Sequence, residues 1–461
     1  MKHRSILSGI KLGACALLAG VLTFTASAAQ VAAIYHFTNG PDGAGPWAGL
    51  VEASDGNFYG TATAGGLNGN GTVFRITKAG ILTTLHSFNG TNGAMPSAGL
   101  IQARDGNLYG TTSGGGLFPG LGTVFRCSPG GVFTPLHFFG FTNGAFPNGG
   151  LTEATNGWLY GTTFGGKLGH GSVFRISTNG QFTTLYSFTN GLDGANPEKV
   201  ALLQARDGHL YGTASKGGAH GFGTLYRITL AGDFKPVYSF TGGADGSKPV
   251  AGLIEGRDGN LYGTASQRGA ANFGTTYRIT RAGAFTLLHA FTNRVDGRYP
   301  ISNLIEMSDG WFYGTTQSDG INPRGTIFGV NAAGDFKVVS GLTDATGGNC
   351  APGIGLVHGG DGNLYGTAPA AGATGYGTVF RVTGVPGPPA PIRLQPGRTA
   401  GGQLVFNFST AINLTYAVEM ATNLAAPQWL IVTNVSGSGG EFQWTAPASP
   451  LPAAFYRVRQ F

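Results

Sequence analysis

The feature that most constrains the fold is a Tyr-Gly-Thr triplet that returns seven times along the chain. Its tyrosines are Tyr59, Tyr109, Tyr160, Tyr211, Tyr262, Tyr313 and Tyr365. Successive copies lie 50, 51, 51, 51, 51 and 52 residues apart. A period held this closely indicates that each copy is one supersecondary unit stacked against its neighbours. The sequence therefore predicts a repeat architecture.

The second copy shows what one unit contains. Short apolar or β-branched runs occupy residues 98–103, 108–113, 122–126 and 133–138. Asp105-Gly106 between the first two runs supplies the positive φ that a tight hairpin needs. Four short strands per unit, separated by turn signals, are typical of a β-propeller blade. A helical solenoid is excluded because glycine inside a helix costs about 1 kcal/mol, and a parallel β-helix has shorter coils. We expect an all-β, seven-bladed propeller.

The two ends of the repeat region complement each other. Residues 31–37 match the fourth strand of later copies, and the seventh copy ends after its third strand, 378–382. We therefore expect the N-terminal strand to pair with that third strand and to close the ring. Closure removes two open sheet edges, which otherwise invite aggregation.

Outside the ring, three further segments are predicted. Residues 1–29 resemble a secretory signal peptide, with a basic start, an apolar stretch and cleavage after about Ala28 or Ala29. Its apolar stretch is too short to span a membrane, and a lipid-bearing Cys15 is disfavoured because the apolar stretch follows that cysteine. The propeller then covers 30–383, a Pro/Gly linker 384–391, and a small fibronectin III- or immunoglobulin-like β-sandwich 392–461.

Composition excludes several classes of protein. Glycine contributes 83 of 461 residues, but disorder requires few aromatics and high charge, and here aromatics and charged residues each make up 11%. Without the signal segment, 25 basic residues face 21 acidic ones, with no basic stripe, so nucleic acid is not expected as a partner. Cys127 and Cys350 fall on non-adjacent units, which predicts two unpaired thiols.

The pattern D-G-N-L-Y-G-T-x-x-x-G-G … G-T-V-F-R-I resembles the GloVer tandem-repeat family of secreted bacterial proteins of the Gloeobacter and Verrucomicrobia type. The resemblance covers residues 31–383. It implies a secreted or surface protein without an assigned activity. The chain ends without the apolar helix and basic cluster of the family's sorting anchors, so no such anchor is expected. Residues 414–458 resemble a C-terminal β module common in such proteins.

Most recurring polar residues are expected to be structural. An aspartate precedes glycine in six copies and Asn156 replaces it in the third; this exchange preserves turn chemistry but would destroy a base. An arginine recurs on the third strand of six copies. We expect these arginines to pair with neighbouring carboxylates or carbonyls. The alternative is that they form a ring that attracts an anionic ligand.

Two metal hypotheses are also disfavoured. His36, His86, His137 and His289 fall on fourth strands of separate blades. The loops between blades carry Asp42, Asp193, Asp245 and Asp296, but each offers a single carboxylate, whereas Ca²⁺ takes 6–8 oxygen ligands. We expect no metal and no cofactor.

We expect a monomeric, secreted or cell-surface, non-catalytic propeller for binding or scaffolding, with an extracellular glycan or protein as partner. An extracellular polysaccharide lyase or hydrolase is the alternative. A purely structural envelope component is a third. Ligand-binding candidates are residues at which the repeat deviates in blades 3 and 6: Trp158, Lys167, His170, Asp319 and Arg324. The recognition face is expected to carry the inter-blade loops and the glycine-rich loops after each second strand.

Overall fold

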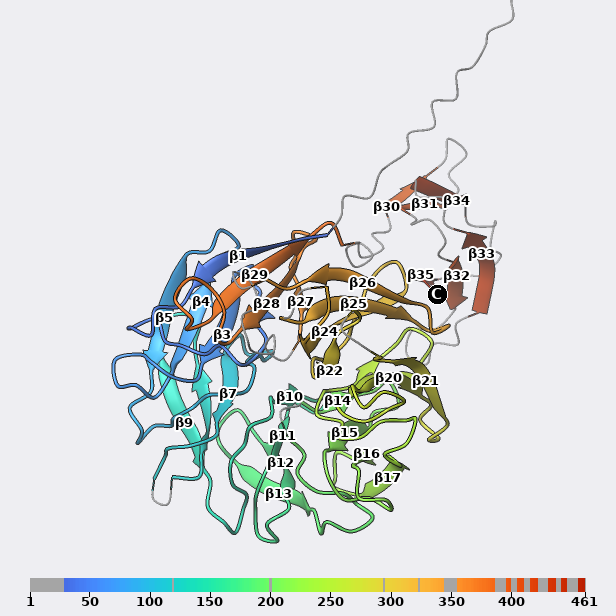
Figure 1. The fold of residues 1–461 in the computed structure, drawn as a ribbon. Coiled ribbons are helices and arrows are strands. Elements are labelled where there is room, and N and C mark those ends of the chain that lie inside the picture. The colour runs from blue at the N-terminus through green and yellow to red at the C-terminus, as the bar shows by residue number, and fades with distance from the viewer. Residues whose placement is uncertain are drawn as a thin grey trace, which may run out of the picture.

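The structure is a computed structural model that describes residues 29–117, 120–198, 201–292, 295–321, 324–343 and 355–385, followed by six strands between 395 and 460. Each repeat forms an antiparallel sheet whose strands pair in chain order. The sheets stand around a common centre, so that the chain runs once round the ring in Figure 1. The predicted seven-bladed all-β propeller is confirmed.

Within each blade the four strands differ in length and burial. The innermost strands have two residues: β2 (Val51–Glu52), β6 (Ile101–Gln102), β10 (Thr152–Glu153), β14 (Leu203–Gln204), β18 (Ile254–Glu255), β23 (Ile305–Glu306) and β27 (Val357–His358). The second strands carry the Tyr-Gly-Thr triplet: β3 (Phe58–Ala62), β7 (Leu108–Thr112), β11 (Leu159–Thr163), β15 (Leu210–Ala214), β19 (Leu261–Ala265), β24 (Trp311–Ser318) and β28 (Leu364–Ala368).

The outer two strands complete each sheet. The third strands are β4 (Thr72–Ile76), β8 (Thr123–Cys127), β12 (Ser172–Ile176), β16 (Thr224–Ile228), β20 (Thr275–Ile279), β25 (Thr326–Asn331) and β29 (Thr378–Thr383). The fourth strands are β5 (Leu82–Ser87), β9 (Phe133–Phe138), β13 (Phe182–Ser187), β17 (Phe234–Ser239), β21 (Phe285–Ala290), β26 (Phe336–Gly341) and, for the seventh blade, β1 (Gln30–His36).

The ring closes as the sequence predicts. Strand β1 pairs antiparallel with β29, and their register joins Val31 to Val382 and His36 to Thr378. In Figure 1 the blue first strand lies beside the orange strands of the last blade. The N-terminal strand thus occupies the edge that the seventh copy leaves open, and no blade ends in an unpaired third strand.

The hydrophobic core is divided among the seven junctions between blades. One buried cluster, for example, joins Tyr109 and Val124 of the second blade to Leu159 and Phe174 of the third. Every tyrosine of the triplet is at most 1% exposed. Each blade therefore contributes to two clusters, one on each side, and gains most of its apolar burial only in the assembled ring.

The glycine of the triplet allows this close packing. A Cβ placed on Gly110 would lie 2.6 Å from both Leu100 Cδ2 and Phe125 Cζ. Both neighbours are buried side chains of the same blade. The triplet thus combines a space-filling tyrosine with a glycine over which two apolar side chains meet.

The sixth blade departs from the pattern. Its second strand, β24, has eight residues, and the extension pairs with an additional strand, β22 (Arg298–Pro300). Beyond the ring, β30 (Gln395–Arg398), β31 (Leu404–Ser409) and β34 (Glu441–Thr445) form one three-stranded sheet. Another contains β33 (Leu430–Ser436), β32 (Thr415–Ala421) and β35 (Phe455–Gln460). This pair of sheets agrees with the predicted small β-sandwich.

The cysteines and the segments outside the ring were also subjects of prediction. Cys127 is buried and unpaired, and its burial raises the pKa of the thiol to about 11. Cys350, residues 1–28 and most of the predicted linker lie outside the described residues. In the described ranges, no helix has the length and apolar character that a bilayer crossing requires.

Candidate functional site

The ends of the sheets form two different faces of the ring. The loop face carries the connections after each second strand (63–71 in the first blade) and the connections between blades (37–50 at the first). The turn face carries the tight turns of each blade (53–57 and 77–81 in the first). Isolated bridges such as Ala44 to Ala64 and Ser247 to Gln267 join the two kinds of connection on the loop face. The predicted pairing of these loops on one side is therefore confirmed.

Carboxylates of the inter-blade loops are used within those loops. Asp42 accepts the Thr38 N–H at 2.8 Å, the Thr38 hydroxyl at 2.5 Å, the Gly40 N–H at 3.2 Å and the Tyr35 hydroxyl at 3.0 Å. Asp193 repeats the arrangement with Tyr186 and Thr189. Among the described residues, no group of three or more potential ligands is placed to hold a metal ion.

In the described part of the chain, the residue before each inter-blade proline has a left-handed backbone. This position is occupied by Gly45, Met95, Phe146, Asn196, Lys248 and Tyr299, with φ between +52° and +64°. Glycine adopts this conformation freely, whereas other residues lose about 1–2 kcal/mol. Five of six described copies nevertheless carry a side chain, and its type changes from blade to blade. Such local strain with varied chemistry is typical of binding positions.

Backbone contacts from the preceding blade hold these residues in place. The Met95 N–H donates to the Asn70 carbonyl at 3.0 Å, and the Lys248 N–H donates to the Phe222 carbonyl at 3.0 Å. Gly45 is held in the same way by Tyr376, across the closure of the ring, at 2.8 Å. The backbone is thus uniform while the side chains differ.

In four blades the threonine of the repeated triplet positions the chain just after a proline, whereas the hydroxyls of Thr162, Thr264 and Thr315 have no hydrogen-bond partner. The Thr61 hydroxyl donates to the Ala98 carbonyl at 3.1 Å, Thr111 donates to Gly149 at 3.1 Å, and Thr367 donates to Ala48 at 2.8 Å. Each bond crosses from one blade to the segment that enters the next. The invariant motif therefore supports the variable residues that surround the centre of the loop face.

A cavity of about 730 Å³ opens at that centre. Fifteen residues line it, all from the segments around the prolines and from the starts of the glycine-rich loops: Trp47, Thr63, Ala64, Met95, Ser97, Ser113, Asn148, Glu198, Lys248, Val250, Ser266, Gln267, Tyr299, Ile301 and Gln317. A separate, narrower cavity of about 160 Å³ is lined by the glycines and leucines of the inner segments, with Asn303. The first cavity falls within the usual size of small-molecule sites.

The cavity combines aromatic rings, amides and few charges. Trp47, 39% exposed, contributes an indole. Asn148, Gln267 and Gln317 contribute amides that both donate and accept hydrogen bonds. Glu198 is the single carboxylate among the lining residues, and its Oε1 accepts the Ser215 hydroxyl at 2.8 Å.

The predicted site residues of the third blade lie apart from this cavity. Trp158 is on the turn face, where the Arg175 guanidinium lies 4.7 Å from its ring. Lys167 and His170 follow the other end of β11, roughly 17 Å away at the usual rise of a strand. The His170 carbonyl accepts the Asn196 N–H at 2.8 Å, so it supports one of the left-handed residues.

The predicted residues of the sixth blade are close to each other. Asp319 and Arg324 form a backbone bridge across the loop after β24. The Asp319 carboxylate forms a close ion pair with Arg298. None of the five predicted residues is among those that line the cavity. Their contact with a ligand stays a prediction, and sequence reasoning missed the cavity residues themselves.

The aspartate of each turn-face hairpin holds its own turn and the triplet tyrosine. Asp105 accepts the Tyr109 hydroxyl at 2.6 Å and the Asn107 N–H at 3.0 Å. Burial opposes ionisation of Asp105, but these hydrogen bonds outweigh it and lower the pKa of the carboxyl. The predicted structural role of these aspartates is supported.

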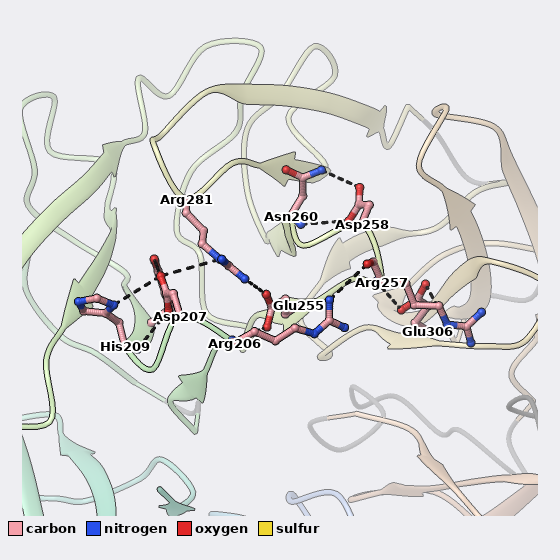
Figure 2. A network of polar contacts seen from close by, with 10 residues as sticks. Arg206, Asp207, His209, Glu255, Arg257, Asp258, Asn260, Arg281 and Glu306 are labelled. Atoms are coloured by element: carbon pink, nitrogen blue, oxygen red, sulfur yellow. Dashed lines mark hydrogen bonds and ion pairs between the residues drawn. The ribbon is translucent and has the colours of Figure 1, made fainter. Parts of the chain in front are cut away.

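Acidic and amide side chains also join neighbouring blades on the turn face. In six of the seven inner strands the second residue accepts a backbone N–H from the previous blade's turn at 2.7–3.2 Å: Glu52, Gln102, Glu153, Gln204, Glu255 and Glu306. Figure 2 shows this arrangement around Arg206, Glu255 and Glu306, with Arg281 contacting both Glu255 and Asp207. The charges of this network are paired, which indicates a structural role.

The recurring arginines and histidines are also accounted for locally. Arg175 and Arg278 donate to carbonyls of the next blade at 3.5 and 3.4 Å, as the structural interpretation predicts. The histidine set needs one correction. On β1, the fourth strand of the seventh blade, Tyr35 and not His36 occupies the equivalent position, since Tyr35 hydrogen-bonds to Asp42 as His289 does to Asp296.

The model of the Gloeobacter/Verrucomicrobia repeat matches residues 18–205 and 190–380. Among curated proteins, none matches the chain.

Several solved structures share the fold. The extracellular domain of BT4673 from B. thetaiotaomicron, described as a hybrid two component system, is 14% identical with a TM-score of 0.51; the match covers 94% of this chain and 57% of that one. The BP39L lectin from Burkholderia pseudomallei is 10% identical with a TM-score of 0.50, covering 85% of this chain and 99% of the lectin. A puromycin hydrolase mutant complexed with PGG is 13% identical with a TM-score of 0.47, covering 80% and 59%. At these identities the likeness concerns the fold alone.

Proposed function

The chain belongs to the Gloeobacter/Verrucomicrobia repeat family, and from the cavity at the centre of its loop face we propose that it is a non-catalytic binding protein for an extracellular glycan. The observation that carries this proposal is the ring of left-handed residues before the prolines. One backbone conformation is kept in six described copies, while the side chain changes among the three of them that line the cavity, Met95, Lys248 and Tyr299. A purely structural ring would have no reason to place different bulky side chains at a strained position.

The chemistry of the cavity suits a saccharide. A sugar presents apolar C–H faces and a rim of hydroxyl groups, each of which donates and accepts hydrogen bonds. Trp47 and Tyr299 offer rings for the apolar faces, and Asn148, Gln267 and Gln317 offer amides for the hydroxyls. Pockets that combine aromatic walls with a few polar groups in this way bind and orient small ligands.

Two further expectations belong to this proposal. We propose that residues 1–29 direct export, so that the cavity meets ligands outside the cytoplasm. We also propose that residues 384–391 link the propeller to a separate module, 392–461. The lectin and the extracellular domain among the similar structures support the idea that this fold can serve such a role.

The alternative, a polysaccharide-active enzyme, has less support in the cavity. Glycoside hydrolysis ordinarily uses two carboxyl groups, about 5–9.5 Å apart, on either side of the scissile bond. Glu198 is the single carboxylate among the lining residues. The cavity therefore favours binding over hydrolysis, although a lyase would not need the second carboxylate.

A glycan array followed by calorimetric titration of the full chain tests the proposal. Trp47→Ser removes the indole and installs the residue that the second blade carries at the same position, Ser97. We expect binding to weaken about 30-fold, as for a buried aromatic anchor.

The matched control is Ile81→Ser, an exposed apolar residue of the turn face at 68% exposure. This variant should bind like the wild type. Equal losses in both variants, or no glycan bound by the wild type, would contradict the proposal. Release of shortened or unsaturated saccharides would favour the enzymatic alternative.

A further inference from the structure

The basic residues of the loop face are concentrated on one side. The connections of blades 1–3 and 7 contribute one lysine or arginine to this face, Lys167. The connections at blades 4–6 contribute five described ones, here called the basic sector: Lys216, Lys248, Arg268, Arg298 and Arg324. The same connections also carry five described carboxylates, so the formal charges balance: Asp193, Glu198, Asp245, Asp296 and Asp319. Three of these carboxylates, Asp193, Asp245 and Asp296, are buried within their own loops, whereas Lys216 and Arg268 are exposed.

Several of these cations already have local contacts. Arg298 pairs with Asp319 and lies over the Phe273 ring at 4.5 Å. Arg268 lies over the Phe222 ring at 4.2 Å. The charges of Arg298 and Arg268 are therefore partly compensated by a carboxylate or an aromatic ring.

Lys248 differs because it lines the cavity itself. Its side chain is half-buried, and no described carboxylate forms an ion pair with it. Glu198, the single acid of the cavity, is hydrogen-bonded to Ser215. An ammonium group that lines a cavity without an ion-pair partner among the described residues can pair with an anion that enters the cavity.

Hydrogen bonds of the Lys248 backbone N–H and carbonyl hold the start of its side chain in place. Its N–H donates to the Phe222 carbonyl at 3.0 Å, and its carbonyl accepts both the N–H and the hydroxyl of Ser266, at 3.1 and 2.9 Å. The residue has φ +55°, a conformation that glycine would adopt at lower cost and does adopt at Gly45. Keeping a lysine here indicates a use for its charge.

We propose that the glycan bound in the cavity is acidic, and that Lys248 contacts its anionic group. The inference rests on the proposed glycan-binding function and specifies its ligand. The anionic group is a uronic acid carboxylate or a sulfate ester, because both present oxygen acceptors to a lysine ammonium. The aromatic and amide side chains of the cavity contact the rest of the sugar.

The test uses calorimetric titrations of the full chain with three hexasaccharides. One is built of uronic acids, one carries sulfate esters, and one is neutral. Lys248→Met removes the charge and should fold normally, because Met95 already occupies the equivalent position with φ +52°. Lys235→Met is the matched control, since Lys235 is an exposed residue of the outer strand β17.

We expect the wild type to prefer an acidic hexasaccharide over the neutral one. Lys248→Met should weaken acidic binding about 10- to 100-fold, as for a lost charge-assisted hydrogen bond, and should weaken neutral binding by a clearly smaller factor. Lys235→Met should change neither. The preferred acidic ligand identifies the anion as carboxylate or sulfate.

Two outcomes would overturn the inference. If neutral and acidic ligands bind equally, or if Lys248→Met keeps wild-type affinity for the acidic one, the glycan proposal survives without its acidic specificity. If none of the three hexasaccharides binds, and the array also shows no ligand, both proposals are wrong.

Discussion

Replacing one tyrosine of the repeated triplet by phenylalanine should weaken the fold in a pH-dependent way. Tyr109 is fully buried, and its hydroxyl donates to Asp105 Oδ2 at 2.6 Å. Tyr109→Phe keeps the ring and its packing in place. The change therefore isolates one hydrogen bond to a carboxylate.

The expected magnitude follows from the surroundings of Asp105. Hydrogen bonds to charged groups contribute about 1.5–3 kcal/mol. Asp105 is exposed and keeps the backbone and amide contacts of Asn107 after the change, so screening and these remaining partners favour the low end. We expect a loss of about 1.5 kcal/mol at pH 7, roughly 0.5 M in the urea midpoint for a slope near 3 kcal/mol/M.

The sign of the pH dependence follows from the pKa of Asp105. Hydrogen bonds from Tyr109 and Asn107 lower that pKa in the folded state despite the opposing effect of burial. The stabilisation is present above the unfolded-state pKa, about 3.9, and is lost as pH falls through the lower folded value. The difference between wild type and Tyr109→Phe should therefore shrink at pH 3.

The third blade supplies a matched control. The Tyr160 hydroxyl accepts a hydrogen bond from the neutral amide of Asn156 at 2.9 Å. The same hydroxyl donates to the Leu230 carbonyl at 3.1 Å. Tyr160→Phe should cost about 1 kcal/mol at both pH values. Urea unfolding followed by tryptophan fluorescence at pH 7 and pH 3 measures both variants. Identical pH profiles, or no cost of Tyr109→Phe at pH 7, would refute the proposed role of the turn aspartate.

Two other predictions concern the packing between and within blades. Glu255→Gln should be nearly neutral in thermal unfolding because an amide, as in Gln204, still accepts the Arg206 N–H. Glu255→Ala should cost about 1–3 kcal/mol by leaving that N–H without an acceptor and Arg281 with Asp207 alone; equal effects would contradict the proposed junction. Gly110→Ala should cost about 1–3 kcal/mol in the same assay, since its Cβ would lie 2.6 Å from two buried side chains; a stabilised variant would show that the core relaxes freely.

The architecture could be predicted because one local solution is repeated. Asp-Gly specifies the hairpin, and Gly106 has the expected positive φ of +82°. The complementary leftover strand at residues 31–37 specified the closure. The strand predicted over 98–103 is less accurate, because only Ile101 and Gln102 pair regularly near the crowded centre of the ring.

The cavity could not be predicted so directly. Its residues lie in ten separate stretches of the chain that are brought together only by the geometry of the closed ring. A signal was nevertheless present in the sequence, since the residues on either side of each inter-blade proline change type while the proline stays. The deviations chosen instead, such as Trp158 and Lys167, lie on the opposite face and at a loop tip. Variation at a fixed repeat position indicates a ligand-binding residue only where that position faces the axis of the ring.

The central claim is that the variable residues of the loop face bind the ligand, while the repeated core maintains the ring. Hydrogen–deuterium exchange of the full chain, with and without a uronic acid hexasaccharide, tests it most directly. The account predicts added protection in the segments after the prolines, such as 47–50, 97–100 and 250–253, and none in the turn-face hairpins such as 104–107. Protection confined to the turn face, or spread evenly over all blades, would contradict it.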